Sequence, residues 1–235
     1  MDASKLKLVL LPGMYGTGEL FADFIEALPI GFAAQAVGYP NDVSLSYRDL
    51  LHLVRSCVPI SEPYVIVAES FSTPLAIQFA ATNPPNLMGV VLCAGFATSP
   101  VRGFLRFLTP FLAPVLGRLP VSGLAGRIAV FGSTAPESLQ DRLRGAMAAV
   151  TPRVLMDRVR TVVGCNALEE IREIQVPVLY MHARHDRVVN AVCLEEIRRV
   201  KPEIDVVVLN GPHILLQQMP QQTAEIVVSF VRRLS

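Results

Sequence analysis

The clearest potential for chemistry in this sequence lies at Ser70, where an apolar run meets a helical pattern. Residues 65–67 read Val-Ile-Val, a β-branched run typical of a buried parallel strand. Residues 75–80 then place apolar side chains at helical spacing. Since little chain is left for the turn between them, Ser70 must lie on it, between the small residues Ala68 and Ser72. A serine on so sharp a turn holds its hydroxyl clear of the backbone, where a base can take its proton.

The residues of this turn allow two interpretations. Ala-Glu-Ser-Phe-Ser follows the G-x-S-x-G pattern of a nucleophile elbow, with Ala and Ser in place of the two glycines. In that interpretation, the helix N-terminus behind Ser70 also offers N–H groups and a positive dipole end to a developing oxyanion. In the other, Ser70 caps the helix of a plain strand–turn–helix. Pro74 fits the first helical turn in both cases.

A serine nucleophile needs a histidine as base and a carboxylate that orients it. Of the four histidines, His52 falls inside a predicted helix and His182 inside a predicted strand. His185 and His213 directly follow strands, at the edge where parallel sheets place their ligands. His213 follows the last strand and Asp186 the strand before it, which gives the chain order Ser, Asp, His. The alternatives are a surface-turn carboxylate and an ordinary loop histidine.

A glycine-rich loop, Pro-Gly-Met-Tyr-Gly-Thr-Gly at residues 12–18, follows the first predicted strand. Such loops cradle phosphates or present a backbone N–H to an oxyanion. The spacing G-x-x-G-x-G lacks both the G-x-G-x-x-G order and the Walker lysine, which disfavours a nucleotide site. The oxyanion use is therefore favoured, and a turn without any ligand is the alternative.

Strands and helices alternate along most of the chain. Strands are predicted at residues 6–11, 32–37, 65–67, 88–94, 176–182 and 204–209. Helices are predicted at residues 19–28, 47–57, 75–80, 190–200 and 220–234, and a loop at 210–215. Alternation at this spacing predicts βαβ units and hence an α/β fold with a parallel sheet.

Residues 98–164 interrupt this alternation. An apolar stretch broken by prolines and glycines carries Arg102, Arg106 and Arg118, and helices are predicted at 138–150 and 152–163. We predict that residues 98–164 form a helical cap over the active site, while residues 1–97 and 165–235 form the core. Ordinary helical core and a helix lying on a membrane surface are the alternatives.

The composition narrows the class of protein. With 51% hydrophobic residues and a mean hydropathy of +0.44, the chain has apolar residues for a large pocket or an apolar cap besides its core. A net charge of +1 without a lysine-rich run argues against a nucleic-acid partner.

Other composition signals concern location and cofactors. The apolar run at residues 8–11 is too short for a signal peptide, and no apolar stretch is long enough for stable membrane insertion. Four cysteines without paired spacing predict reduced thiols, so we expect a cytoplasmic protein. No cofactor is predicted, and no metal either, because His182, His185 and Asp186 lack further ligands.

Four motifs in the expected order resemble the α/β-hydrolase superfamily, most closely its small carboxylesterase- and lipase-like members. They are Leu-Pro-Gly-Met after the first strand, Ala-Glu-Ser-Phe-Ser at the turn, His-Asp-Arg-Val-Val after the fifth strand and Gly-Pro-His after the last. The resemblance covers nearly the whole chain. It implies Ser70 as nucleophile, His213 as general base and acid, and Asp186 as the group that holds the imidazole tautomer. It also implies an oxyanion hole made by the N–H groups of Met14 and Phe71.

The sequence departs from the family pattern in three places. Both elbow glycines are missing, which puts the geometry of Ser70 in question. Pro-Gly stands in the oxyanion loop where His-Gly is usual. The usual N-terminal antiparallel hairpin is also missing, so we expect about six parallel strands.

The resemblance implies a serine hydrolase that cleaves carboxylic esters of apolar acyl groups through an acyl-enzyme on Ser70. Its substrate would be a small-molecule ester. The predicted pocket residues are Tyr15, Phe96, Phe104, Phe107 and Ile214. An acyltransferase with the same triad is one alternative, since Leu-Pro-Gly-x-x-Gly-Thr-Gly also resembles the loop of some lipid acyltransferases. A ligand-binding protein with this fold and little turnover is another. The sequence gives neither the acyl length nor the oligomeric state.

Overall fold

The computed structural model describes residues 6–101 and 135–234, which contain one sheet of six parallel strands in the order β2-β1-β3-β4-β5-β6. The strands are β1 (Lys7–Leu11), β2 (Ala33–Ala36), β3 (Tyr64–Glu69), β4 (Leu87–Cys93), β5 (Val178–Ala183) and β6 (Asp205–Leu209). Each was predicted to within two residues at either end. The α/β fold with about six parallel strands is therefore confirmed.

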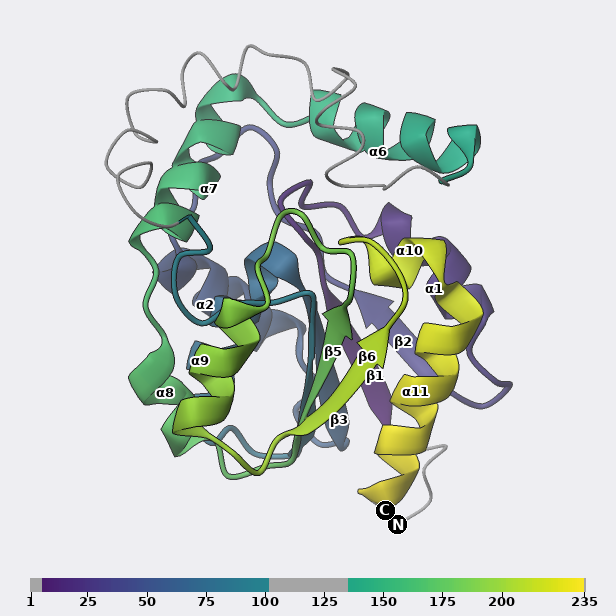
Figure 1. Cartoon of the computed structure of the whole chain (residues 1–235), viewed down its shortest axis with the longest axis vertical. Helices are drawn as coiled ribbons and strands as arrows, with labels where there is room; N and C mark the ends of the chain where they lie inside the picture. Colours follow the sequence, from purple (N-terminus) through teal and green to yellow (C-terminus); the bar gives the residue numbers. More distant parts are fainter. Residues whose placement is uncertain (1–5, 102–134, 235) are drawn as a thin grey trace.

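Helices cover both faces of the sheet (Figure 1). One face packs against α2 (Tyr47–Cys57), α3 (Thr73–Ala81), α8 (Leu168–Glu173) and α9 (Val192–Val200). The other packs against α1 (Ala22–Glu26), α10 (Leu215–Gln218) and α11 (Pro220–Arg233). Along β3, Ile66 and Ala68 point to the first face and Val65 and Val67 to the second. Because both faces are buried, the strand is an unbroken apolar run rather than an alternating one.

The helices differ from the predictions in three places. The predicted helix at 19–28 starts as a 3-10 turn, η2 (Glu19–Phe21), and its α-helical part α1 ends at Glu26, shortly before Pro29. A proline disfavours helical geometry in the residue before it, which explains the early end. Two helices, α8 and α10, were not predicted. They have six and four residues, too few to show a helical period. The predicted loop at 210–215 is therefore wrong at its last residue.

Two further helices, α6 (Glu137–Ala148) and α7 (Pro152–Gly164), lie over the carboxyl edge of the sheet (Figure 1). Leu139 and Leu143 of α6 pack against Tyr15 and Ile214, which belong to the loops after β1 and β6. The Asp157 carboxylate of α7 accepts a hydrogen bond of 2.6 Å from the hydroxyl of Ser44. The helices predicted at 138–150 and 152–163 are thus present, whereas the segment from 102 to 134 lies outside the described residues. The division into core and cap stays a prediction.

In the described part of the chain, no helix combines the length and the apolar character that crossing a bilayer requires.

Candidate functional site

Ser70 lies directly after β3, at the start of a 3-10 turn, η3 (Ser70–Ser72), that continues into α3. Its φ angle is +48°, in the left-handed region that residues other than glycine rarely adopt. The surroundings hold this strained backbone in place, since the hydroxyl of Thr73 donates to the Ser70 carbonyl at 2.8 Å. The sharp turn expected at Ser70 is therefore present, with Pro74 in the first turn of α3.

The structure explains why a serine can stand where the elbow pattern has its second glycine. The Ser72 side chain is fully buried, and its hydroxyl donates to the carbonyl of Pro12. The Tyr39 hydroxyl lies 2.6 Å from the same Ser72 oxygen and serves as its donor. Burial raises the pKa of Tyr39, so this hydroxyl keeps its proton. Ser72 thus ties the turn that carries Ser70 to the glycine-rich loop.

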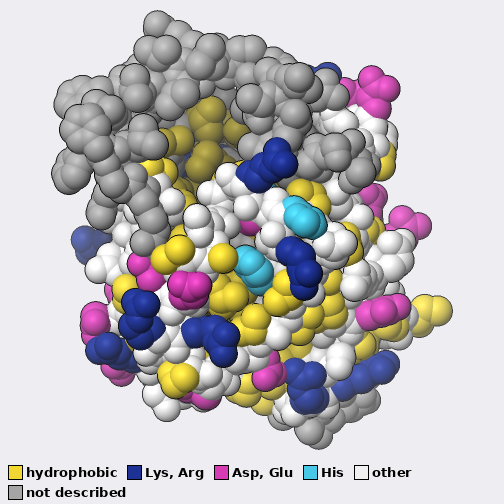
Figure 2. All heavy atoms as spheres, viewed as in Figure 1, with side chains coloured by type: hydrophobic (Ala, Val, Ile, Leu, Met, Phe, Trp, Pro, Cys, Tyr) yellow, Lys and Arg dark blue, Asp and Glu magenta, His cyan; other side chains and the backbone are white. Residues whose placement is uncertain are grey.

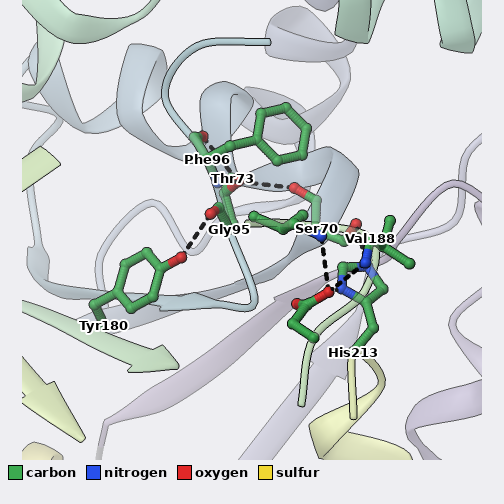
Figure 3. Close-up of polar contacts among 9 residues, drawn as sticks. Ser70, Thr73, Gly95, Phe96, Tyr180, Val188 and His213 are labelled. Atoms are coloured by element: carbon green, nitrogen blue, oxygen red, sulfur yellow. Dashed lines mark hydrogen bonds and ion pairs between the residues drawn. The ribbon is translucent and has the colours of Figure 1, made fainter. Parts of the chain in front are cut away.

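The three predicted catalytic side chains meet at the carboxyl edge of the sheet, where Figure 3 shows Ser70 and His213 side by side. His213 Nε2 lies 2.8 Å from Ser70 Oγ, and His213 Nδ1 lies 2.8 Å from Asp186 Oδ2. Because the carboxylate can only accept, Nδ1 carries the proton, and the lone pair of Nε2 faces the Ser70 hydroxyl. Only 5% of His213 is exposed, so the imidazole itself is largely shielded from bulk water.

The Asp186 carboxylate is fixed by its own loop. Its Oδ1 accepts from the backbone N–H groups of Val188 and Val189, at 2.8 and 2.7 Å. The other oxygen is therefore left for the imidazole of His213. The neighbouring His185 points elsewhere, with its Nε2 lying 2.8 Å from Oδ1 of Asn210. Asp186 is thus the acid that the structure brings to His213, while His185 is not part of this chain of hydrogen bonds.

The glycine-rich loop presents the predicted oxyanion donor in a fixed orientation. The Gly16 N–H donates to the Gly13 carbonyl at 3.0 Å. In a trans peptide the N–H points opposite to the carbonyl, so this bond also sets the direction of the Met14 N–H. The second predicted donor, the N–H of Phe71, lies on the first turn after Ser70, and its residue is anchored because the Tyr47 hydroxyl donates to the Phe71 carbonyl at 2.7 Å.

A residue that the sequence analysis missed, Arg158 of α7, reaches across to the same loop. Its Nη1 donates to the Met14 carbonyl at 2.7 Å and its Nη2 to the Pro40 carbonyl at 2.8 Å. The side chain is 4% exposed, and no carboxylate of the described residues pairs with it. Burial lowers the pKa of this guanidinium. Gly16, with φ of +73°, leaves the space, since a Cβ there would lie 2.7 Å from the guanidinium nitrogens.

Two more residues that were not predicted, Glu69 and Gln217, form a buried polar cluster with Tyr15. The Tyr15 hydroxyl donates to Glu69 Oε2, and Gln217 Nε2 donates to the same oxygen at 3.0 Å. Gln217 Nε2 also lies 3.1 Å from the Tyr15 oxygen. Glu69 is 1% exposed, and burial is the main cause that raises its pKa.

The five predicted pocket residues fall into three groups. Tyr15 and Ile214 pack in one apolar cluster with residues of α6, although the Tyr15 hydroxyl turns away to Glu69. Phe96 is 2% exposed and belongs to the core beside α3. Phe104 and Phe107 lie outside the described residues. A pocket made by these five residues therefore stays a prediction.

The missed residues do leave a signal in the sequence. Val154, Arg158 and Val162 stand four residues apart on one buried stripe of α7, so a charged residue interrupts an apolar face. Glu69 similarly ends the unbroken apolar run of β3. A charged side chain at a position that the periodicity assigns to the interior is rarely buried without a partner. Such positions are worth treating as candidates for a site.

Charges on the face shown in Figure 2 are mixed, with Lys and Arg interspersed among Asp, Glu and apolar side chains. The described residues on this face form no continuous basic area of the kind that binds nucleic acid.

Comparison with known proteins gives a match to one family and many solved structures with a similar fold. A family model described as "Alpha/beta hydrolase family" matches residues 8–226. No curated protein matches the chain.

Among solved structures, similar folds include a hydrolase from Oleispira antarctica, with 11% identity, a TM-score of 0.81, and coverage of 98% of this chain and 96% of that one. An esterase from Thermogutta terrifontis has 14% identity and a TM-score of 0.81, with 97% and 90% covered. An esterase from Exiguobacterium antarcticum has 15% identity and a TM-score of 0.81, with 97% and 92% covered. At these identities the likeness concerns the fold alone.

Proposed function

The chain belongs to the alpha/beta hydrolase family, and from this premise we propose that it is a serine hydrolase that cleaves carboxylic esters of apolar acyl groups. The observation that carries the proposal is the continuous chain of hydrogen bonds from Ser70 through His213 to Asp186. A hydroxyl held 2.8 Å from an imidazole nitrogen whose other nitrogen faces a carboxylate has the geometry for nucleophilic catalysis.

The reaction would proceed in two halves. Ser70 Oγ attacks the ester carbonyl carbon while His213 Nε2 takes the hydroxyl proton. The N–H groups of Met14 and Phe71 then hold the oxyanion of the tetrahedral intermediate, a contribution of about 3 kcal/mol per donor in comparable sites. As the carbon–oxygen bond of the ester breaks, His213 gives its proton to the leaving alkoxide. Water repeats these steps on the acyl-enzyme, releases the acid and restores Ser70.

An apolar acyl group is favoured by the side chains that surround the site. Tyr15 and Ile214, from the loops that carry the proposed oxyanion donor and the proposed base, pack with Leu139 and Leu143 of α6. Burying an apolar acyl chain there would contribute about 25 cal/mol per Å² of area removed from water. No disulfide joins the four cysteines, all of which lie in the described part of the chain, and this fits the cytoplasmic location expected from the sequence.

The test uses a series of p-nitrophenyl esters of increasing acyl length and a fluorophosphonate that labels active serines. We expect turnover that rises with acyl length and one covalent adduct on Ser70. Ser70→Ala should lower kcat by about a million-fold and abolish the adduct. Ser99→Ala is the matched control, since it removes another buried serine hydroxyl, which among the described residues donates to the nearby Val101 carbonyl.

The outcomes of this test separate the candidate functions. Absence of both turnover and adduct from the unmodified protein would reject the serine hydrolase. If added alcohol turns the products from free acid into a new ester at the expense of hydrolysis, the protein is an acyltransferase with the same nucleophile. Tight binding of an ester that Ser70→Ala leaves unchanged, with negligible hydrolysis, would indicate a ligand-binding protein.

A further inference from the structure

A buried carboxyl group that the proposed reaction does not use lies next to the nucleophile. Glu69 is the residue before Ser70, and its side chain points into the protein, where 1% of it is exposed. Two neutral side chains donate to one of its oxygens, the hydroxyl of Tyr15 and the amide of Gln217. Its other oxygen has no partner among the described residues. We call Tyr15, Glu69 and Gln217 the acid clamp.

The position of the acid clamp suggests what it does. Tyr15 follows Met14, whose N–H is the proposed oxyanion donor, and lies 54 residues from Glu69. Gln217 lies on α10, four residues after the proposed base His213 and 148 residues from Glu69. A single carboxyl oxygen next to Ser70 therefore joins the loop of the oxyanion donor to the loop of the base.

Retaining an acid here is costly, which argues for a role. No Lys or Arg of the described part of the chain contacts Glu69, and burial raises the pKa of its carboxyl. A buried acceptor without a partner, as Oε1 is among the described residues, itself destabilises the folded protein. The Tyr15 hydroxyl keeps its proton as donor, because burial and the nearby Glu69 raise its pKa far above the usual range. An apolar side chain at position 69 would avoid these costs and would also release both loops.

We propose that Glu69 is a positioning residue for the reaction at Ser70, because its carboxyl oxygen fixes the Met14 N–H and the His213 imidazole relative to the nucleophile. The inference rests on the proposed function and deepens it. Misplacement of catalytic groups by about 1 Å can lower the rate about 100-fold. Loss of the acid clamp between the two loops should therefore lower the rate strongly. The clamp acts through hydrogen bonds, and a neutral acceptor of the same shape should replace the carboxyl.

The experiment compares Glu69→Gln with Glu69→Met in the full chain. The glutamine oxygen can accept from both Tyr15 and Gln217, whereas methionine has a similar shape without a strong acceptor. We expect Glu69→Met to lower kcat by about 30- to 100-fold, with KM changed less than about 3-fold. Glu69→Gln should stay within about 5-fold of the unmodified enzyme. Rates are expressed per active site titrated with fluorophosphonate, so that loss of folded protein does not count as loss of rate.

The two donors provide a second test that depends less on the folding of the Glu69 variants. Tyr15→Phe and Gln217→Met should each lower kcat by about 10-fold, and the double variant should lose clearly less than the product of the two losses. Tyr64→Phe is the matched control: it removes a buried hydroxyl without a described partner from the opposite end of β3 and should leave kcat unchanged.

The results distinguish this inference from the proposed function. If the unmodified protein neither turns over esters nor reacts with fluorophosphonate, the proposed function is wrong, and so is the positioning role of Glu69 that rests on it. If the unmodified protein is active and Glu69→Met lowers only the melting temperature, Glu69 has a structural role and the inference is wrong. Equal losses in Glu69→Gln and Glu69→Met would also overturn it, because the charge and not the hydrogen bonds would then matter.

Discussion

Two loops at the carboxyl edge of the sheet hold their functional groups in opposite ways. After β5, Asp186 is fixed by backbone N–H groups two and three residues further along the chain. After β1, the glycine-rich loop is held by side chains that are distant in sequence. Ser72 binds the Pro12 carbonyl across 60 residues, and Arg158 binds the Met14 carbonyl across 144. The acid is thus positioned by local structure. In the glycine-rich loop the local Gly13–Gly16 hydrogen bond orients the Met14 N–H, but tertiary contacts hold the loop as a whole in place.

This difference has a consequence for how each loop responds to change. A loop fixed by its own backbone keeps its shape when a distant side chain is lost. The glycine-rich loop depends on η3, on α7 and on the segment after β2, whose Tyr39 N–H donates to the Gly16 carbonyl at 2.7 Å. Because Arg158 belongs to the predicted cap, the geometry of the proposed oxyanion hole is coupled to how that cap packs. Because only the glycine-rich loop is coupled to distant side chains, mutations in the two loops should affect rate and stability differently.

Of the changes in the two loops, Asp186→Asn should give the largest effect on rate and almost none on structure. The asparagine oxygen can still accept from the N–H groups of Val188 and Val189, so the loop is kept. Its amide would then donate to His213 Nδ1, which places the other proton on Nε2, where it blocks proton transfer from Ser70. We expect kcat to fall by about 10³- to 10⁴-fold, as for the corresponding change in serine proteases. Ester turnover and urea unfolding measured on the same sample check this.

The expected signature is a collapse in rate with a free energy of unfolding within about 1 kcal/mol of the unmodified protein. A large loss of stability in Asp186→Asn would mean that this loop also relies on its contact with His213. The loop that carries Asp186 would then not be held by its own backbone alone.

Arg158→Met should show the reverse, a large loss of stability with a small loss of rate. The change removes donors from the partly buried carbonyls of Met14 and Pro40, and each unsatisfied group costs at most about 1–3 kcal/mol. We expect the free energy of unfolding to fall by about 2–4 kcal/mol, while kcat falls only about 10-fold, since the Gly13–Gly16 hydrogen bond still orients the Met14 N–H. Thermal unfolding and the rate per titrated site measure both.

Arg160→Met is the matched control for this change. It lies on the same helix, but 56% of its side chain is exposed, where it pairs with Asp157 three residues earlier. Exposed pairs of this kind contribute at most about 1 kcal/mol. If both arginine variants behaved alike, the tertiary support of the glycine-rich loop by Arg158 would be refuted.

The same contrast explains what could be predicted from the sequence. The strands, the sharp turn at Ser70 and the order Ser70, Asp186, His213 follow from local patterns: apolar runs, small residues and polar residues placed directly after strands. The fold and the meeting of the three side chains could therefore be predicted from the sequence, because parallel strands bring their carboxyl ends to one edge of the sheet.

Tertiary partners could not be predicted in the same way. Nothing near Arg158 in the sequence indicates that its guanidinium reaches Met14, and nothing near Glu69 indicates Tyr15 or Gln217. The replaced elbow glycine at Ser72 raised doubt about the geometry of Ser70, yet in the structure its hydroxyl binds the Pro12 carbonyl and supports that geometry. Short helices such as α8 and α10 are also set by packing rather than by a sequence period.

The smallest expected effect is a change of stability with pH, and it should affect the glycine-rich loop but not the loop that carries Asp186. Asp23 of α1 pairs with Arg142 of α6, and the hydrogen bond from Arg142 lowers the pKa of Asp23 below its ordinary value of 3.8. A carboxylate whose pKa is lowered on folding stabilises the folded protein above its unfolded pKa, and this contribution is lost as the pH falls through the folded pKa. Between pH 5 and pH 3 the pair should therefore weaken. Since 38% of the Asp23 side chain is exposed, the loss is less than about 1 kcal/mol.

Weaker docking of α6 should loosen the glycine-rich loop, because Leu139 and Leu143 pack on Tyr15. Hydrogen exchange at pH 5 and pH 3, corrected for intrinsic rates, should show faster opening at residues 12–18 than at residues 186–190. Asp23→Asn lacks the charge at both pH values, so its exchange in residues 12–18 should already be raised at pH 5 and change little on acidification. If acid instead opened both loops equally in the unmodified protein, the coupling of the glycine-rich loop to α6 would have no special part in its stability.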